Sequence, residues 1–228
     1  MVKVRADLGR TANANSVAII GLGRFGRAVA LELMDSGTEV LGIDSNEDIV
    51  QGLNGQLTHV VQADSTKEEA LRQLSVPDFD RVVVAIGSDV QSSILTTSIL
   101  LSFPRTHLWA KAVSEPHGRI LEQLGVQHVI YPESDMGRRV AHLVRGSMQD
   151  YLEIGEDFAL VKTRPAAKFV GTPLGELGIR TAFGVTITAV KKPGVPWTYA
   201  DAATVLGIDD VIIVTGPTRN AETFSQLR

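Results

Sequence analysis

The sequence predicts an α/β protein in which a doubly wound, parallel, Rossmann-like sheet is followed by a small α+β domain. Short apolar strands alternate with helical segments from Ser16 onward, which is the pattern of a parallel sheet with helices on both faces. A glycine-rich turn, GLGRFG, joins the first strand to the first helix, and from Tyr151 the strands become short and closely spaced. We therefore expect a disordered tail over residues 1–15, a first domain over 16–147 and a second domain over 148–228.

The turn GLGRFG has the glycine spacing of a nucleotide-binding fingerprint. Gly21 permits the tight bend, Gly23 lets a phosphate approach the backbone, and Gly26 lets the following helix pack closely on the strand. That helix presents unpaired N–H groups and the positive end of its dipole to an anion. Asp44 ends the next strand, about twenty residues on, where a carboxylate accepts hydrogen bonds from ribose hydroxyls. This context predicts an adenine-nucleotide site, and a glycine turn that serves only the packing of a βαβ unit is the alternative.

The rest of the first domain continues the alternation of strands and helices. The expected strands cover 17–20, 39–44, 59–63, 81–87, 107–113 and 128–131. We expect Gly37 to close the first helix, Ser45 to cap the second, and further helices to cover 68–74, 89–102 and 116–124. A helix over 134–147 has no strand after it to cover in the same sheet, so we expect it to be a bridging or exchanged element.

The second domain is expected to hold strands at 158–163, 185–191 and 210–215, with short helices near 173–177 and 220–227. A module of about eighty residues uses most of its volume for its own core. It is therefore too small to house an elaborate substrate site as well.

Composition excludes several classes of function. A net charge of −4 without a basic stripe argues against nucleic acid as a partner. The sequence also lacks a polybasic segment, so we expect no direct lipid binding. The absence of cysteine excludes disulfides, thiolate metal sites and cysteine nucleophiles. The longest apolar run, near 94–103, is too short to span a bilayer, which needs about 20 residues, so we expect a soluble chain.

Several motifs in a fixed order carry a family resemblance. They are GLGRFG, Asp44, ADSTKEEALRQL, AIGSDVQSSILTT, WAKAV and YPESDMG, followed by the small C-terminal module. Over residues 16 to about 217 the chain resembles the cytosolic regulatory subunits of Ktr/Trk potassium-uptake systems, built from an RCK N-domain (TrkA-N) and an RCK C-domain (TrkA-C). The resemblance is strongest to the ATP-responsive, KtrA-like members.

The resemblance implies a non-enzymatic gating ring. Homodimers pair through their first domains and assemble to a homo-octamer, which docks on the cytoplasmic face of a potassium-translocating integral membrane subunit. Exchange of ATP for ADP changes the shape of the ring. A cytoplasmic location, peripheral to the membrane through this partner, follows.

The resemblance also places nucleotide contacts, nearly all of them at the carboxyl ends of strands, where open α/β sheets bind ligands. They are Gly21, Gly23, Arg24, Phe25, Gly26, Asp44, Ser45, Asn46, Asp64, Ser65, Ile86, Gly87, Ser88, Lys111, His117 and Glu133. ATP or ADP is the implied ligand, with NAD(H) less favoured. Glu133 and its symmetry mate are implied to lie beside a divalent cation, Mg²⁺ or Ca²⁺, at the dimer interface. Arg180 is implied as a phosphate contact in a second site, for cyclic di-AMP.

The residue types agree with these roles, and simpler alternatives stay open. Arg24 offers a fixed fork of donors to a terminal phosphate, or is an exposed arginine at a helix start. Asp44 opposes the 2′-phosphate of NADP. Lys111 lies within a strand, where a charge requires a partner such as a phosphate or carboxylate, unless its ammonium reaches water at an edge.

Four further residues have an equally local alternative. Asp64 and Ser65 can serve as a helix N-cap, and Glu133 can favour the start of a helix that Ser134 caps. Arg180 precedes Thr181, Ala182 and Phe183, which can form a plain turn before a strand.

The five histidines, His59, His107, His117, His128 and His142, are scattered without metal-ligand spacing. Packing or surface roles are expected for them, with His117 as a candidate ribose or base contact. Two rival functions remain: an NAD(H)-binding regulator of a cation antiporter, and an NAD-dependent oxidoreductase, for which no set of proton donors and acceptors is evident.

Overall fold

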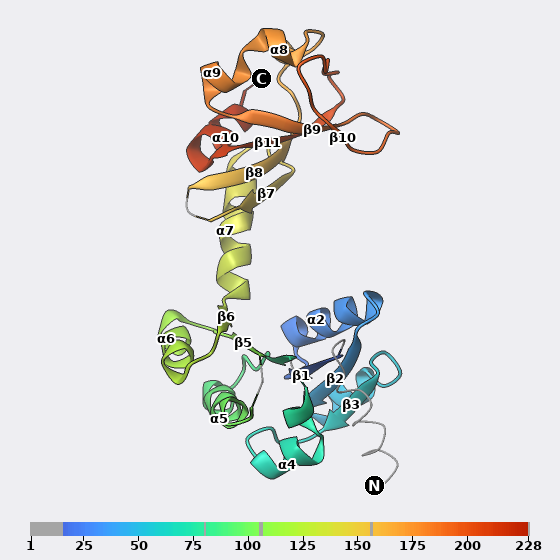
Figure 1. Cartoon of the computed structure of the whole chain (residues 1–228), viewed down its shortest axis with the longest axis vertical. Helices are drawn as coiled ribbons and strands as arrows, with labels where there is room; N and C mark the ends of the chain where they lie inside the picture. Colours follow the sequence, from blue (N-terminus) through green and yellow to red (C-terminus); the bar gives the residue numbers. More distant parts are fainter. Residues whose placement is uncertain (1–15, 80, 105–106, 156, 228) are drawn as a thin grey trace. The chain divides into compact units, whose positions relative to one another are not determined.

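The computed structural model of the chain describes residues 16–79, 81–104, 107–155 and 157–227 (Figure 1). The tail expected over 1–15 lies outside these residues. The chain forms two compact units that meet in sequence between Glu133 and Ser134. The helix that we expected to close the first domain begins at Pro132 and lies almost entirely in the second unit. The expected boundary near 148 differs from this division by the length of that helix.

The first unit is built on a six-stranded parallel sheet with the strand order β3-β2-β1-β4-β5-β6. The strands are β1 (Ser16–Ile20), β2 (Glu39–Asp44), β3 (His59–Gln62), β4 (Arg81–Val84), β5 (His107–Lys111) and β6 (His128–Ile130). The order reverses between β1 and β4, which is the topological switch point where such sheets bind ligands. The doubly wound fold predicted from the sequence is confirmed.

Helices cover both faces of this sheet (Figure 1). They are α2 (Arg24–Asp35), α3 (Glu47–Gly52), α4 (Glu68–Gln73), α5 (Val90–Leu101) and α6 (Glu115–Leu124), with a 3₁₀ turn η1 (Val76–Asp78). Ala18 and Ile20 of β1 pack with side chains from α4, α5 and α6, whereas Val17 and Ile19 pack with Ala30 of α2. Because neighbouring residues of a strand point to opposite faces and both faces are covered, every residue of β1 is buried.

The cap of α3 differs from our expectation. Asn46, not Ser45, occupies the N-cap, and its side-chain oxygen accepts hydrogen bonds from the amides of Asp48 and Ile49. Strand β2 ends at Asp44, so Ser45 still belongs to the turn and the first helical amides lie within reach of Asn46. Asp89, where we expected the next helix to begin, is the N-cap of α5, and its carboxylate accepts a hydrogen bond from the amide of Ser92.

The second unit contains a five-stranded antiparallel sheet with the order β10-β9-β11-β8-β7. Its elements are α7 (Pro132–Arg145), β7 (Asp150–Glu153), β8 (Phe158–Thr163), η2 (Ala167–Phe169), α8 (Leu174–Leu177), α9 (Ile179–Phe183), β9 (Thr186–Lys191), β10 (Thr198–Tyr199), β11 (Val211–Pro217) and α10 (Thr218–Ser225). The sequence did not indicate β7, β10 or α9. Residues 181–183, for which a plain turn was the alternative, lie within α9.

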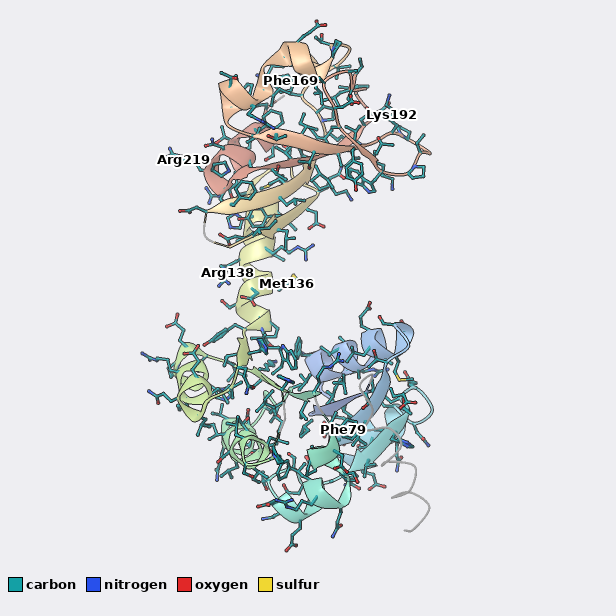
Figure 2. All side chains as sticks on the ribbon, viewed as in Figure 1. Phe79, Met136, Arg138, Phe169, Lys192 and Arg219 are labelled. Atoms are coloured by element: carbon teal, nitrogen blue, oxygen red, sulfur yellow. The ribbon has the colours of Figure 1, made fainter. Side chains whose placement is uncertain are left out.

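Each unit has its own core. Phe79 is fully buried in the first and Phe169 is buried in the second, where its ring stacks on Phe224 at 5.3 Å between centroids (Figure 2). Within the second unit, α7 is tied to the sheet by an ion pair between Arg139 and Asp150, with 2.5 Å between nitrogen and oxygen. Among the described residues, no helix combines the length and apolar character that crossing a bilayer requires.

The close approach of α2 to the glycine turn gives the first prediction. A Cβ atom on Gly26 would lie 1.9 Å from the carbonyl oxygen of Gly21 and 3.0 Å from Cβ of Ala85. Because backbone cannot move aside as a flexible side chain does, Gly26→Ala should lower the free energy of unfolding by at least about 2 kcal/mol in urea denaturation.

Gly23→Ala is the matched control. A Cβ atom there meets nothing within 4 Å, and the residue has an ordinary φ of −61°. Its cost should stay below about 1 kcal/mol, the scale of an altered N-cap. Equal losses in the two variants would contradict the proposed packing constraint.

Candidate nucleotide-binding site

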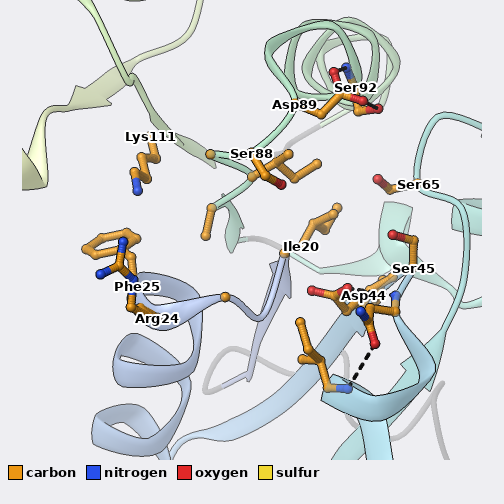
Figure 3. Close-up of a pocket in the computed structure, with 18 of the residues that line it drawn as sticks. Ile20, Arg24, Phe25, Asp44, Ser45, Ser65, Ser88, Asp89, Ser92 and Lys111 are labelled. Atoms are coloured by element: carbon orange, nitrogen blue, oxygen red, sulfur yellow. Dashed lines mark hydrogen bonds between the residues drawn. The ribbon is translucent and has the colours of Figure 1, made fainter.

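A cavity of about 730 Å³ opens at the carboxyl ends of the strands of the first unit, over the switch point (Figure 3). It brings together most of the residues that the sequence singled out. Those in the lining are Gly21, Gly23, Arg24, Phe25, Asp44, Ser45, Asn46, Asp64, Ser65, Ile86, Gly87, Ser88, Lys111 and Glu133. Gly26 and His117 do not line it, and Arg180 belongs to the second unit.

The lining also contains residues that sequence reasoning missed. They are Ile20, Ile43, Ile49, Ala63, Thr66, Ala85, Asp89, Ser92 and Val113. Most are apolar neighbours of expected contacts, and they form the walls of the cavity. Asp89 was predictable, because it follows directly after a loop already expected to contact nucleotide.

The glycine turn forms the floor of the cavity. Gly21 has a φ of +92°, a conformation that side-chain-bearing residues rarely adopt, and its amide donates to the carbonyl of Ile43 at 2.8 Å. Gly23 is the N-cap of α2 and supplies no side-chain hydrogen bond to that helix. The open space beside Gly23 lets a ligand approach the first amides of α2, a twelve-residue helix.

Asp44 braces this turn from the neighbouring strand. One carboxylate oxygen accepts a hydrogen bond from the amide of Leu22 at 2.7 Å, and the other accepts from the amide of Asn46 at 2.8 Å. Each oxygen keeps lone-pair capacity for a further donor. The carboxylate is therefore held in a fixed position while it can still accept from a ligand hydroxyl.

The two cationic side chains of the cavity, Arg24 and Lys111, lie on the same side of it. Figure 3 shows Arg24 and Lys111 near Phe25 on one side, and Asp44 with Ser45 on the other. The Nζ atom of Lys111 lies 2.5 Å from a carboxylate oxygen of Glu133 and 5.7 Å from the ring centroid of Phe25. The hydrogen bond from Lys111 is the main cause that lowers the pKa of Glu133, and the charge of Arg24 acts in the same direction.

Glu133 lies in the first turn of α7, which begins at Pro132. Ser134 is therefore inside the helix and does not cap it, contrary to our expectation. A proline at the first helical position was the signal for this earlier start.

Asp64 and Ser65 also line the cavity, and both are bound to nearby polar groups. Asp64 accepts from the side-chain oxygen of Thr66 at 2.6 Å and from its amide at 3.0 Å, which lowers the pKa of Asp64. Lys67, not Asp64, stands at the N-cap position of α4. Ser65 is buried and its hydroxyl pairs with that of Thr96 at 2.9 Å. The expected N-cap alternative for Asp64 and Ser65 is therefore not what the structure shows.

His117 lies away from the cavity, buried in the first turn of α6. Its Nδ1 accepts from the amide of Val113 at 3.3 Å, while Nε2 has no hydrogen-bond partner among the described residues. Burial lowers the pKa of His117.

In the second unit, Arg180 lies in α9 and its Nε donates to the hydroxyl of Thr186 at 3.1 Å.

The described residues contain no group of three or more His, Asp or Glu side chains that is arranged to hold a metal ion. Glu133, the expected metal ligand, forms an ion pair with Lys111. Because Mg²⁺ at nucleotide sites is commonly held by one or two carboxylates together with phosphate oxygens, a cation shared between two copies of Glu133 stays a prediction.

Fold and cavity together define a nucleotide-binding protein of the doubly wound class. Comparison with known families agrees, since the TrkA-N domain model matches residues 17–132. The chain is 36% identical over 210 residues to Ktr system potassium uptake protein C of Bacillus subtilis, covering 92% of this chain and 95% of the relative. It is 37% identical over 201 residues to Ktr system potassium uptake protein A of Vibrio alginolyticus, covering 88% and 91%. The chain therefore belongs to the TrkA-N family and groups with the Ktr potassium uptake proteins.

Solved structures show the same fold. The crystal structure of the GsuK RCK domain has a TM-score of 0.64 at 20% identity, covering 94% of this chain and 48% of that one. The GsuK channel bound to NAD has a TM-score of 0.64 at 19% identity, covering 93% and 39%. GsuK bound to ADP has a TM-score of 0.50 at 25% identity, covering 62% and 37%. This chain thus spans about half or less of those chains, and the matches show that its fold is that of RCK domains, as the resemblance predicted.

Burial of His117 predicts a pH dependence of stability. Because its folded pKa lies below the ordinary 6.5, the unfolded chain takes up a proton at higher pH than the folded one. The contribution of His117 to the free energy of unfolding is full above about pH 6.5 and declines as the pH falls through the interval below it. Urea denaturation at pH 7.5 and 5.5 should therefore show a smaller difference for His117→Gln than for the wild type. His59→Gln, at a less buried site, is the control, and an unchanged difference in His117→Gln would contradict the inference.

Proposed function

We propose that this chain is a nucleotide-sensing regulatory subunit of a potassium uptake system, which binds ATP or ADP without transforming it. The observation that carries the proposal is similarity to a Ktr potassium uptake protein over 95% of that relative's length. The cavity of the first unit supplies a site of suitable chemistry. We propose further that the nucleotide changes the shape of an assembly that gates a potassium-translocating membrane subunit.

The arrangement of charge in the cavity supports one orientation of the nucleotide. Asp44 faces the ribose, as an acidic residue does in the dinucleotide-binding fold, and the phosphates lie over Gly23 and the N-terminus of α2. Arg24 and Lys111 then stand beside the phosphates. In this orientation Asp64, which follows β3, lies beside the adenosine part of the nucleotide.

Discrimination between ATP and ADP has to come from the third phosphate. Two ligands shift a conformational equilibrium differently only if their affinities for the two conformations differ. Arg24 is the proposed source of that difference, since a guanidinium fork forms charge-assisted bonds to phosphate oxygens.

The assembly is part of the same proposal. By the family resemblance, two copies pair through the first unit, and dimers close to an octameric ring that docks on the membrane partner from the cytoplasm. Leu95 of α5 and Ile120 and Leu124 of α6 are exposed apolar side chains that support pairing of first units.

A second candidate has a specific observation in its favour. GsuK, which shares the fold, has been solved bound to NAD as well as to ADP. An NAD(H)-binding regulator, including one that serves a cation antiporter, is therefore the alternative. Calorimetric titration with ATP, ADP, NADH and cyclic di-AMP separates the two, and consumption of NADH with a carbonyl substrate would instead indicate an oxidoreductase.

The test of the ATP and ADP proposal uses Arg24→Ala. Loss of a hydrogen bond to a charged group costs about 1.5–3 kcal/mol, so affinity for ATP should fall roughly ten- to hundredfold. Affinity for ADP should fall less than about threefold, since ADP lacks the phosphate that Arg24 contacts. Calorimetry at fixed ionic strength measures both.

Arg27→Ala is the matched control, because Arg27 is exposed on the same helix and does not line the cavity. It removes the same charge and should leave both affinities within about twofold. Equal losses of ATP and ADP affinity in Arg24→Ala would remove Arg24 from the proposed role.

A further inference from the structure

Tyr131 joins the last strand of the first unit to the start of α7. Strand β6 ends at Ile130, and the carbonyl of Ile130 accepts from the amide of Ala112 at 2.8 Å, which continues the ladder with β5. Only Tyr131 and Pro132 separate Ile130 from Glu133, which lines the cavity. The position of Glu133 therefore depends on how these two residues are held.

The start of α7 has little packing of its own. None of the fourteen residues of this helix, all of which the structure describes, is buried, and the side chain of Glu133 is 64% exposed. Tyr131, in contrast, is partly buried and packs against the hydrophobic core of the first unit. Because Pro132 has a restricted φ, the chain between Tyr131 and Glu133 has few conformations available.

Gly118 of α6 provides the space that the Tyr131 ring occupies. It is a buried residue within the helix, and its amide donates to the carbonyl of Ser114 at 3.0 Å. A Cβ atom on Gly118 would lie 1.7 Å from Oη and 2.5 Å from Cζ of Tyr131. The ring therefore fills the volume that a side chain at position 118 would need, and close-packed interiors do not accommodate both.

This contact also bears on the ion pair in the cavity. The side chain of Lys111 is only 9% exposed, so burial restricts where its ammonium can lie. Its Nζ atom lies 2.5 Å from a carboxylate oxygen of Glu133. A displacement of Tyr131 would move Glu133 while Lys111 stays in β5, so the seat of the ring determines where the carboxylate stands in the cavity.

We propose that Tyr131 and Gly118 are positioning residues of the nucleotide site. The ring of Tyr131, seated against Gly118, holds the carboxylate of Glu133 at the phosphate side of the cavity. Neither residue lines the cavity, so both act through Glu133. The inference rests on the function proposed above and on the predicted contact of Glu133 with the phosphates and their cation.

The experiment measures ATP affinity by calorimetry in excess Mg²⁺. Gly118→Ala should displace the ring and with it Glu133, and affinity should fall at least about tenfold. In a Glu133→Gln background the same substitution should change affinity less than about twofold, because no carboxylate remains to be misplaced. In a Tyr131→Val background it should again change affinity less than about twofold, because the shorter side chain leaves room for a Cβ atom.

Gly137→Ala is the matched control. Gly137 lies in α7, and a Cβ atom there would meet nothing within 4 Å. This variant should keep ATP affinity within about twofold of the wild type, since it adds the same methyl group without displacing a neighbour.

Melting temperature gives a readout that does not need nucleotide. Gly118→Ala should melt below the wild type, and adding Tyr131→Val should raise the melting temperature again, because the overpacking is relieved. If Gly118→Ala does not fold, Tyr131→Val carries the test. It should lower ATP affinity at least about threefold in the wild type and less than about twofold in Glu133→Gln.

Equal losses of ATP affinity with and without Glu133 would mean that the contact serves stability alone, and would overturn this inference while leaving the proposed function intact. A Gly118→Ala variant that melts and binds like Gly137→Ala would overturn it as well. A wild type that binds neither ATP nor ADP would instead overturn the proposed function.

Discussion

The site depends on the contact between the backbone of Gly26 and the carbonyl oxygen of Gly21. That contact leaves no space for a side chain, and it sets how closely α2 approaches β1. The approach places the N-terminus of α2, and with it Arg24, at the edge of the cavity. Asp44 then fixes the turn from β2 through the amide of Leu22. The proposed positions of phosphate and ribose therefore both depend on this short segment.

Much of the fold could be predicted because the signals are local. Alternating apolar strands and amphipathic helices indicate the doubly wound sheet, and the glycine spacing locates its ligand-binding edge. The cap of α3 and the start of α7 were each misplaced by one or two residues, since neighbouring Ser45 and Asn46, or Pro132 and Ser134, are all good helix-start residues. Strand β10 has two residues and α9 has five, too few to show a period.

The sequence predicted which residues line the candidate site better than it predicted which of them contact one another. Lys111 and Glu133 are 22 positions apart, and only the adjacency of β5 and β6 brings them together. His117 follows a strand, as several residues of the cavity lining do, but it is one of the buried residues of α6, together with Gly118 and Leu121. A buried leucine on the same helix face was the available signal. The grouping of Arg24, Lys111 and Glu133 in the cavity follows from tertiary structure and has no signature in local sequence.

The central claim is that the number of phosphates on a bound adenylate changes the arrangement of neighbouring subunits. Small-angle X-ray scattering of the purified full-length assembly, saturated in turn with ATP and ADP, tests this directly. We expect the same molecular mass with two distinguishable scattering profiles. Superimposable profiles at demonstrated saturation would contradict it.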